Sequence, residues 1–105
     1  MKVVGVTACT TGIAHTYMAQ EAIEKECKSR GYEVKIETQG GIGIENELSQ
    51  DEIDEADVVL LAIAIEIEGE ERFDEKKKEG KVLTLDPSVV IRNTKSVIDQ
   101  LEELV

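Results

Sequence analysis

The chain has 105 residues, which is enough for one domain with a single hydrophobic core. Its 23 acidic residues against 12 basic ones give a net charge of −11, so we expect nucleic acids and anionic membrane surfaces to be repelled. An aromatic content of 3 % is also low for a surface that stacks bases. The same charge is compatible with a basic protein as a partner.

The sequence enters a strand pattern directly after Met1, and the longest apolar run, residues 58–65, is too short to cross a bilayer. We therefore expect a cytoplasmic protein. The two cysteines, Cys9 and Cys27, match neither a CxxC motif nor a zinc-binding spacing. In a reducing compartment both are expected to be thiols rather than a disulfide.

The first predicted element is a buried strand in the β-branched run at residues 3–6, followed by small hydroxylated residues and a glycine that lead into a helix. Cys9 is therefore predicted at a strand-to-helix turn. The unpaired N–H groups at a helix start, together with the positive end of the helix dipole, favour a thiolate and can bind an anion. A thiolate beside a cradle for phosphoryl oxygens is what a phosphocysteine requires, so we hypothesise that Cys9 is phosphorylated in function.

A long helix is predicted over residues 14–30, because apolar side chains recur along one stripe and Gly31 is a typical C-terminal glycine. Residues 33–39 alternate polar with apolar, which predicts a half-exposed strand at the edge of the sheet. One face of this strand comprises Val34, Ile36 and Thr38. The glycines within residues 40–43 then predict a flexible turn.

The middle of the chain predicts a short helix and a buried strand. Residues 44–48 show no clear pattern, but Ser49 and Glu52 have the spacing of a capping box, which opens a helix through about Ala56. Residues 58–63 form a continuous apolar run, which is typical of a strand covered on both faces.

A further short helix is predicted within residues 70–79, with Phe73 as its buried anchor and Gly80 at its end. The lysines at 76–78 are expected to be solvated surface. Residues 81–85 form the fourth predicted strand.

The end of the chain completes an alternation of strands and helices. Asp86-Pro87 can cap and start a turn, and apolar residues at helical spacing predict a last helix from Asn93 or Thr94 to Leu104. Alternating strands and helices predict βαβ units, and hence a Rossmann-like three-layer α/β/α sandwich with a parallel sheet. Its binding edge lies at the carboxyl ends of the strands, where Cys9 is predicted. The loops that open on this edge span residues 38–43, 64–69 and 86–88.

The role of Cys9 is weighed against a structural one, because reduced cysteines are among the most buried residues. Its position in the turn favours function, whereas Cys27 lies on the apolar stripe of the first helix and is predicted to be structural. Gly12 either lets backbone N–H groups close around a phosphoryl group or is a plain helix-entry glycine, and the threonine hydroxyls either contact the ligand or cap the helix. The candidate phosphoryl-binding residues are Thr10, Thr11, Gly12, Ile13, Ala14, His15 and Thr16.

His15 is the only histidine of the chain and falls in the predicted first helical turn, where the helix dipole disfavours the protonated ring. A neutral ring can donate a hydrogen bond to a phosphoryl oxygen. The alternative is a surface histidine without a role.

Two classes of phosphate chemistry compete for this loop. Low-molecular-weight protein tyrosine phosphatases and the related arsenate reductases carry Cys-x5-Arg followed by Ser or Thr, whereas here His15 stands at the arginine position and Thr16 follows. Imidazole cannot replace a bidentate, permanently charged clamp on the transition state, so we expect slow hydrolysis and a persistent phosphocysteine, which suits a carrier. Asp86-Pro87 resembles the general-acid dipeptide of those phosphatases, and its alternative is a helix-opening cap.

The segment Thr7-Ala8-Cys9-Thr10-Thr11-Gly12-Ile13-Ala14-His15-Thr16-Tyr17-Met18-Ala19 resembles the phosphorylation loop of fructose-specific enzyme IIB components of the bacterial phosphoenolpyruvate-dependent sugar phosphotransferase system. Further matching segments follow in order at residues 34–40, 42–46, 56–59 and 72–73. The resemblance covers residues 2 to about 73, with a looser fit to the end.

This resemblance implies that residues 1–105 form one fructose-like EIIB domain, with a four-stranded parallel sheet between helices and a fold similar to that of low-molecular-weight tyrosine phosphatases. It implies no metal or organic cofactor. It further implies a relay in which a phosphohistidine of enzyme IIA donates to Cys9, which passes the group to fructose or a related sugar held by the membrane permease, enzyme IIC. The product with fructose is fructose 1-phosphate.

The chain departs from the family pattern at two places. Thr10 stands where proline is common, which is expected to change the stiffness of the loop more than its chemistry. Ala62-Ile63-Ala64-Ile65 stands where many relatives have an aspartate after the third strand, which bears on partner contacts and on the sugar. Two alternatives stay open: a phosphocysteine hydrolase of the low-molecular-weight phosphatase class, and a regulatory EIIB-like module that has kept the fold.

Overall fold

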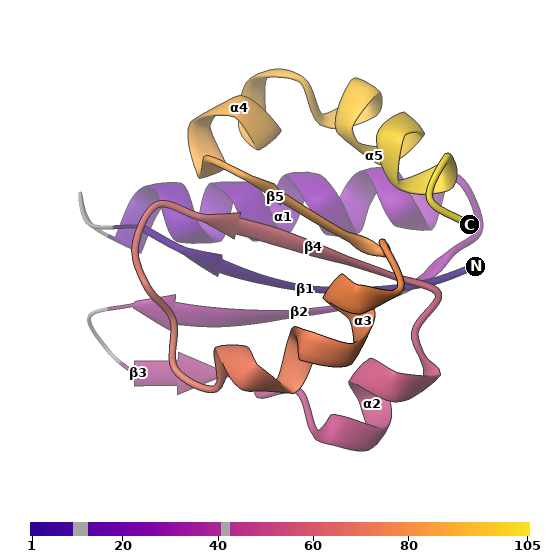
Figure 1. Ribbon diagram of the computed structural model, residues 1–105. Helices are drawn as coiled ribbons and strands as arrows, with labels where there is room; N and C mark the ends of the chain where they lie inside the picture. Colours follow the sequence, from indigo (N-terminus) through magenta and orange to yellow (C-terminus); the bar gives the residue numbers. More distant parts are fainter. Residues whose placement is uncertain (10–12, 41–42) are drawn as a thin grey trace.

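The computed structural model describes residues 1–9, 13–40 and 43–105, without the side chain of Ile13 (Figure 1). The strands are β1 (Lys2–Ala8), β2 (Glu33–Gly40), β3 (Gly43–Glu45), β4 (Val58–Ile63) and β5 (Val82–Leu85). The helices are α1 (Ile13–Ser29), α2 (Gln50–Glu55), η1 (Glu70–Phe73), α3 (Asp74–Lys78), α4 (Pro87–Arg92) and α5 (Thr94–Glu102). Within these ranges, no helix combines the length and the apolar character that a membrane span requires.

The strands form one sheet in the order β3-β2-β1-β4-β5, in which β1 is central. β1 pairs in parallel with β2 and β4, and β4 pairs in parallel with β5. The predicted parallel sheet of four strands is thus confirmed, and the structure adds β3, which runs antiparallel to the end of β2. The prediction that residues 33–39 form an edge strand was wrong at the end of β2, where β3 pairs with it. The sequence did not indicate β3 because a strand of three residues is too short to show a pattern.

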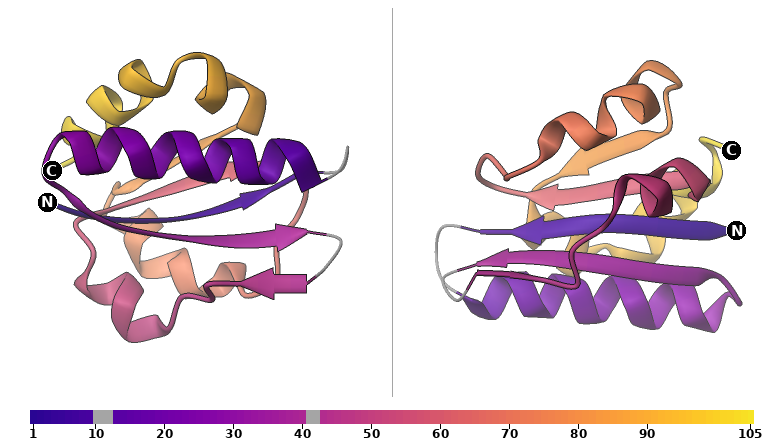
Figure 2. Two further views of the ribbon diagram at one scale, coloured as in Figure 1. Left: turned by 180° about the vertical axis from the view of Figure 1, so that it is seen from behind. Right: turned by 90° about the horizontal axis from the view of Figure 1, so that it is seen from below.

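Helices cover both faces of the sheet, as the three-layer prediction requires (Figures 1 and 2). On one face, α1, α4 and α5 enclose a cluster that includes Ile23, Val90 and Leu101. On the other face, α2 and the helical segment at 70–78 enclose a second cluster with Ile53 and Phe73. Strands β1, β4 and β5 contribute side chains to both clusters, and the side chains of β4 alternate between them, so its long apolar run is buried on both sides.

Two local predictions need correction. The segment after Asp86 forms a six-residue helix, α4, rather than only a turn, with Asp86 as its N-cap and Pro87 in its first turn. Lys76 is buried rather than solvated, because its Nζ donates a hydrogen bond of 3.2 Å to the carbonyl of Asp54. Phe73 is fully buried, as predicted.

Gly5 lies in the central strand at a point where its neighbours leave no room for a side chain. A Cβ there would lie 2.4 Å from the carbonyl oxygen of Leu60 and 3.2 Å from Cδ1 of Ile36. We expect Gly5→Ala to lower the free energy of unfolding by about 2–3 kcal/mol, since the central strands must move apart. Urea denaturation measures this.

The matched control is Gly31→Ala, just after α1. Gly31 has a φ of +79° and no atom within 4 Å of an added Cβ, so this change strains the backbone without a collision. Its expected loss is smaller, about 1 kcal/mol. Equal losses in the two variants would contradict the close approach of β1 to β4 at Gly5.

Candidate functional site

Cys9 directly follows β1 and lies at the edge of the sheet toward which the parallel strands point (Figure 1). The last residue of β1, Ala8, is paired with Gln39 on one side and Ile63 on the other. Three strands therefore end beside Cys9, and α1 begins four residues later at Ile13. The Cys9 side chain is partly exposed, as a group that reacts with a partner protein requires.

The structure brings His15 close to this sulfur. His15 is exposed in the first turn of α1, and its Nδ1 lies 4.0 Å from the Cys9 Sγ. His15 lines one hollow together with Ser88, whose hydroxyl is bonded to the Asp86 carboxylate, so Asp86 lies on the same side of the molecule. The predicted meeting of these three residues at one edge is consistent with this geometry.

The other candidate phosphoryl-binding residues divide into two groups. Thr10, Thr11 and Gly12 lie outside the described residues, so their roles stay predictions. Ile13 and Ala14 begin α1, and Ala14 is exposed.

Thr16 also belongs to the first turns of α1, and it is buried. The hydroxyl oxygens of Thr16 and of Thr7, two residues before Cys9, are both buried and have no hydrogen-bond partner among the residues that the structure describes. Sequence reasoning gave no role to Thr7, because its alternation on β1 marks it only as a strand residue.

Cys27 differs from Cys9 in its exposure to solvent. Its side chain is fully buried in the cluster under α1, and both cysteines are thiols. Burial raises the pKa of Cys27 to about 11, so this thiol stays protonated at neutral pH. The prediction that Cys27 is structural is in agreement with this environment.

The Asp86 carboxylate serves as a helix cap. Its Oδ1 accepts hydrogen bonds from the Ser88 N–H at 2.9 Å and from the Ser88 hydroxyl at 2.7 Å. These bonds lower the pKa of Asp86 below its usual value. An ionised, capping carboxylate does not have the proton that a general acid must donate.

Two features beside the site were missed by sequence reasoning. The Tyr17 hydroxyl donates a hydrogen bond to Glu45, which ties the start of α1 to β3. A hollow of about 300 Å³ lies next to His15. The residues that line this hollow are His15, Met18, Ser88, Ile91 and Arg92. All five come from α1 and α4, two helices separated by more than half of the chain, so no local motif predicts the hollow.

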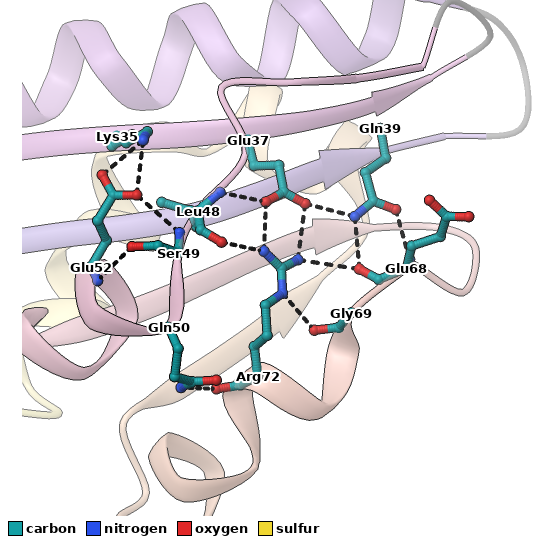
Figure 3. Close-up of polar contacts among 10 residues, drawn as sticks. All are labelled: Lys35, Glu37, Gln39, Leu48, Ser49, Gln50, Glu52, Glu68, Gly69 and Arg72. Atoms are coloured by element: carbon teal, nitrogen blue, oxygen red, sulfur yellow. Dashed lines mark hydrogen bonds and ion pairs between the residues drawn. The ribbon is translucent and has the colours of Figure 1, made fainter.

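A buried ion pair lies at the end of β2, on the face opposite α1 (Figure 3). Glu37 is fully buried, and its two carboxylate oxygens accept hydrogen bonds from Nη1 and Nη2 of Arg72 at 2.8 and 3.0 Å. The Leu48 N–H donates a further bond of 2.8 Å and Gln39 Nε2 one of 2.6 Å. Burial by itself raises the pKa of Glu37, but the bonds from these donors outweigh it, so the pKa lies below its usual value.

The same side chains hold the loop that follows β4 (Figure 3). Gln39 Nε2 donates to the Glu68 carbonyl at 2.9 Å, and Gln39 Oε1 accepts from the Glu68 N–H at 2.8 Å. Arg72 Nε donates to the Gly69 carbonyl at 2.7 Å. We call Glu37, Gln39 and Arg72 the polar cluster.

No group of three or more metal-ligating side chains occurs within residues 1–9, 13–40 and 43–105. The chemistry that the described part of the site offers is that of an accessible thiol near an imidazole, at the start of a helix. Such an arrangement can form and release a covalent bond to an electrophile without a cofactor.

The sequence and the fold match proteins of the sugar phosphotransferase system. The family model of the lactose/cellobiose-specific IIB subunit of that system matches residues 4–100. The PTS system fructose-like EIIB component 2 of Escherichia coli K12 is 43 % identical over 101 residues, which cover 96 % of this chain and 92 % of that protein.

Two solved structures are similar over nearly the whole chain. The crystal structure of a predicted fructose-specific IIB from Escherichia coli has a TM-score of 0.89 and 39 % identity, and covers 98 % of this chain and 88 % of that one. A domain of the fructose-specific IIABC component from Borrelia burgdorferi has a TM-score of 0.82 and 46 % identity, and covers 95 % and 91 % of the two chains.

Proposed function

Since the chain belongs to the enzyme IIB family of the sugar phosphotransferase system, we propose that it carries a phosphoryl group on Cys9 during the uptake of fructose or a related sugar. The donor is a phosphohistidine of enzyme IIA, and the acceptor is the sugar bound by the permease enzyme IIC. A similar domain is part of a fructose-specific IIABC component, a name that joins the three parts in one protein. The relay operates in the cytoplasm, where thiols such as Cys9 and Cys27 stay reduced.

The observation that carries this proposal is the difference between the two thiols. Cys9 is partly exposed at the carboxyl end of the central strand, whereas Cys27 is buried. A phosphoryl group as large as a side chain can reach only the first of them. The N-terminus of α1, a 17-residue helix, follows Cys9 and favours negative charge at that end of the sheet.

The proposed chemistry consists of two displacements at phosphorus. The Cys9 thiolate attacks the phosphorus of phosphohistidine, an S–P bond forms, and the P–N bond breaks, so the donor histidine leaves and takes up a proton. A hydroxyl oxygen of the sugar then attacks the same phosphorus, loses its proton, and expels the Cys9 thiolate. His15, with Nδ1 at 4.0 Å from Sγ, is placed to hydrogen-bond a phosphoryl oxygen on that sulfur.

The capping role of Asp86 favours a carrier over a phosphatase. A phosphocysteine hydrolase of the low-molecular-weight class needs a general acid for its leaving group and a cationic clamp for the transition state. Here Asp86 is ionised and bonded to Ser88, and His15 occupies the position of the clamp in the sequence. Water is therefore expected to hydrolyse the phosphocysteine slowly.

The experiment that tests the proposal is incubation with phosphorylated enzyme IIA, followed by mass spectrometry of the intact protein. We expect one phosphoryl group for each chain, and none after prior alkylation of Cys9. With p-nitrophenyl phosphate as substrate, we expect release of product to stay near stoichiometric. Steady turnover of many equivalents would instead assign the chain to the phosphatases.

A further inference from the structure

The segment after β4, residues 64–66, lies directly beside the site, and we call it the β4 rim. The Ala64 N–H donates a hydrogen bond of 3.0 Å to the carbonyl of Ala8, which belongs to the peptide bond that joins Cys9 to β1. All three rim residues are exposed. The rim therefore forms part of the surface that any protein approaching Cys9 must meet.

The rim presents an aliphatic side chain to solvent. Ile65 is 37 % exposed, although it follows a strand of buried apolar residues. Four large apolar side chains are exposed in the part of the chain that the structure describes. Three of them lie toward the Cys9 end of the sheet, in α1, in β3 and in the loop after β4: Met18, Ile44 and Ile65. Apolar side chains gathered around a reactive group are typical of a protein-binding surface.

The rim is held from both ends. Ala64 is bonded to Ala8, and Ile67 is buried in the cluster below the sheet. Beyond the rim, the side-chain amide of Gln39 is hydrogen-bonded to both the backbone N–H and the backbone carbonyl of Glu68, as a neighbouring strand would be.

The polar cluster fixes the orientation of the Gln39 amide. A carboxylate only accepts hydrogen bonds, so Glu37 orients the Nε2 end of Gln39 toward itself and leaves Oε1 for the Glu68 N–H. The fit is close at the next residue as well. Gly69 has a φ of +71°, and a Cβ there would lie 2.6 Å from Nε of Arg72.

Charge limits what can bind at the rim. Glu66 belongs to it, and the exposed Glu68 follows two residues later. The protein as a whole has a net charge of −11. A complementary partner face therefore has an apolar contact for Ile65 surrounded by basic side chains.

We propose that the β4 rim is a docking contact for the enzyme IIA that donates the phosphoryl group, with Ile65 as the apolar contact and Gln39 as a positioning residue. This inference rests on the proposed function. The polar cluster thus acts on phosphoryl transfer without touching phosphorus, by holding the rim in one conformation beside Cys9.

The first test measures the dissociation constant of unphosphorylated enzyme IIA by calorimetry, for wild type, Ile65→Ser and Val105→Ser. Val105 is 65 % exposed and lies at the opposite end of the sheet, so it is the matched control (Figure 1). We expect Ile65→Ser to raise the dissociation constant about 10-fold and Val105→Ser to leave it unchanged. Equal constants for wild type and Ile65→Ser, or no binding of enzyme IIA to wild type, would overturn the proposal.

The second test separates positioning from stability. Gln39→Leu removes the grip on Glu68, and Arg30→Met removes a comparable set of bonds at the other end of the sheet, to Glu26, Asp99 and Glu102. We expect both variants to unfold more readily, but only Gln39→Leu to weaken binding of enzyme IIA and to speed hydrogen exchange at the Glu68 amide. If Arg30→Met weakened binding as well, the effect of Gln39→Leu would come from lost stability, and Gln39 would not be a positioning residue.

Phosphorylation of wild-type protein is measured in parallel and decides a different question. Binding of enzyme IIA without phosphorylation would refute the carrier function while the rim stands as a docking contact. Phosphorylation of wild type, together with unchanged binding of enzyme IIA to Ile65→Ser and Gln39→Leu, would refute the docking role of the rim while the carrier function stands.

Discussion

Replacing Cys9 by serine is expected to lower phosphoryl acceptance from enzyme IIA by about 10³-fold or more, because a serine hydroxyl is almost fully protonated where a thiolate is available. Cys9 is partly exposed in the turn after β1, so exchange of sulfur for oxygen leaves the packing of the protein intact. Transfer of labelled phosphate measures the loss, and the thermal unfolding of the variant verifies the fold.

Cys27→Ser is the matched control for this prediction. Cys27 is buried and its pKa is raised to about 11, so it does not compete as a nucleophile. The hydroxyl of serine in an apolar cluster is expected to reduce stability by about 1–3 kcal/mol, with transfer retained. Acceptance at the full rate in Cys9→Ser, or its loss only in Cys27→Ser, would remove Cys9 from the mechanism.

The second large effect concerns the buried ion pair. We expect Arg72→Met to lower the free energy of unfolding at neutral pH by about 3–5 kcal/mol, because Glu37 then remains buried without its counter-charge. Urea denaturation measures the loss. Lys78→Met, which breaks an exposed ion pair with Glu75 whose side chains are 74 % and 75 % exposed, is the control and is expected to change little.

The pH dependence of this loss identifies its cause. In wild type the pKa of Glu37 lies below its unfolded value of 4.5, so its contribution to stability is present above that value and is lost as the pH falls through the folded pKa. Without Arg72, burial dominates and the folded pKa of Glu37 rises above 4.5. As the pH falls, Glu37 of the folded variant therefore takes up a proton before it would in the unfolded chain, which removes the cost of the buried charge. The deficit of Arg72→Met should therefore shrink as the pH falls from 7 toward 4.5. A deficit that does not change with pH would mean that lost packing, and not the charge of Glu37, destabilises the variant.

Features that depend on neighbouring residues could be predicted from the sequence. Ser49 and Glu52 form the predicted capping box, in which the Glu52 N–H bonds to the Ser49 hydroxyl and the Ser49 N–H to the Glu52 carboxylate. Asp86 caps the helix after β5, as the structural alternative for Asp86-Pro87 proposed. The apolar strand at 58–63 was predicted with the bounds that β4 has in the structure. In each case the signal lies within one turn or one strand.

Features that depend on distant residues could not be predicted. The alternation of β2 indicates that Glu37 faces solvent, yet it is fully buried because Arg72, 35 residues later, neutralises it. Helix α4 was missed because its β-branched residues, Val89, Val90 and Ile91, disfavour a helix locally, whereas burial of Val90 against α1 and the strands favours it. Packing decided the structure of this segment.

The candidate site could be predicted only in part, for the same reason. The strand-to-helix turn placed Cys9 correctly at the carboxyl end of the sheet, and His15 lies near its sulfur. The bonds of Gln39 to Glu68, which hold the loop that contains the β4 rim, join residues 29 positions apart, and no spacing in the sequence indicates them.

Strand β3 protects the outer side of β2 only over its last residues, Thr38 to Gly40. Toward the start of β2, the outer backbone has no neighbouring strand among the described residues, which is where sheets of separate molecules can join into aggregates. Lys35 stands there and is bonded to Glu52 at 2.7 Å, so a second molecule that extended the sheet would have to desolvate this charge pair. We therefore expect this charge pair to oppose self-association through the open start of β2, and neutralising Lys35 to weaken that protection.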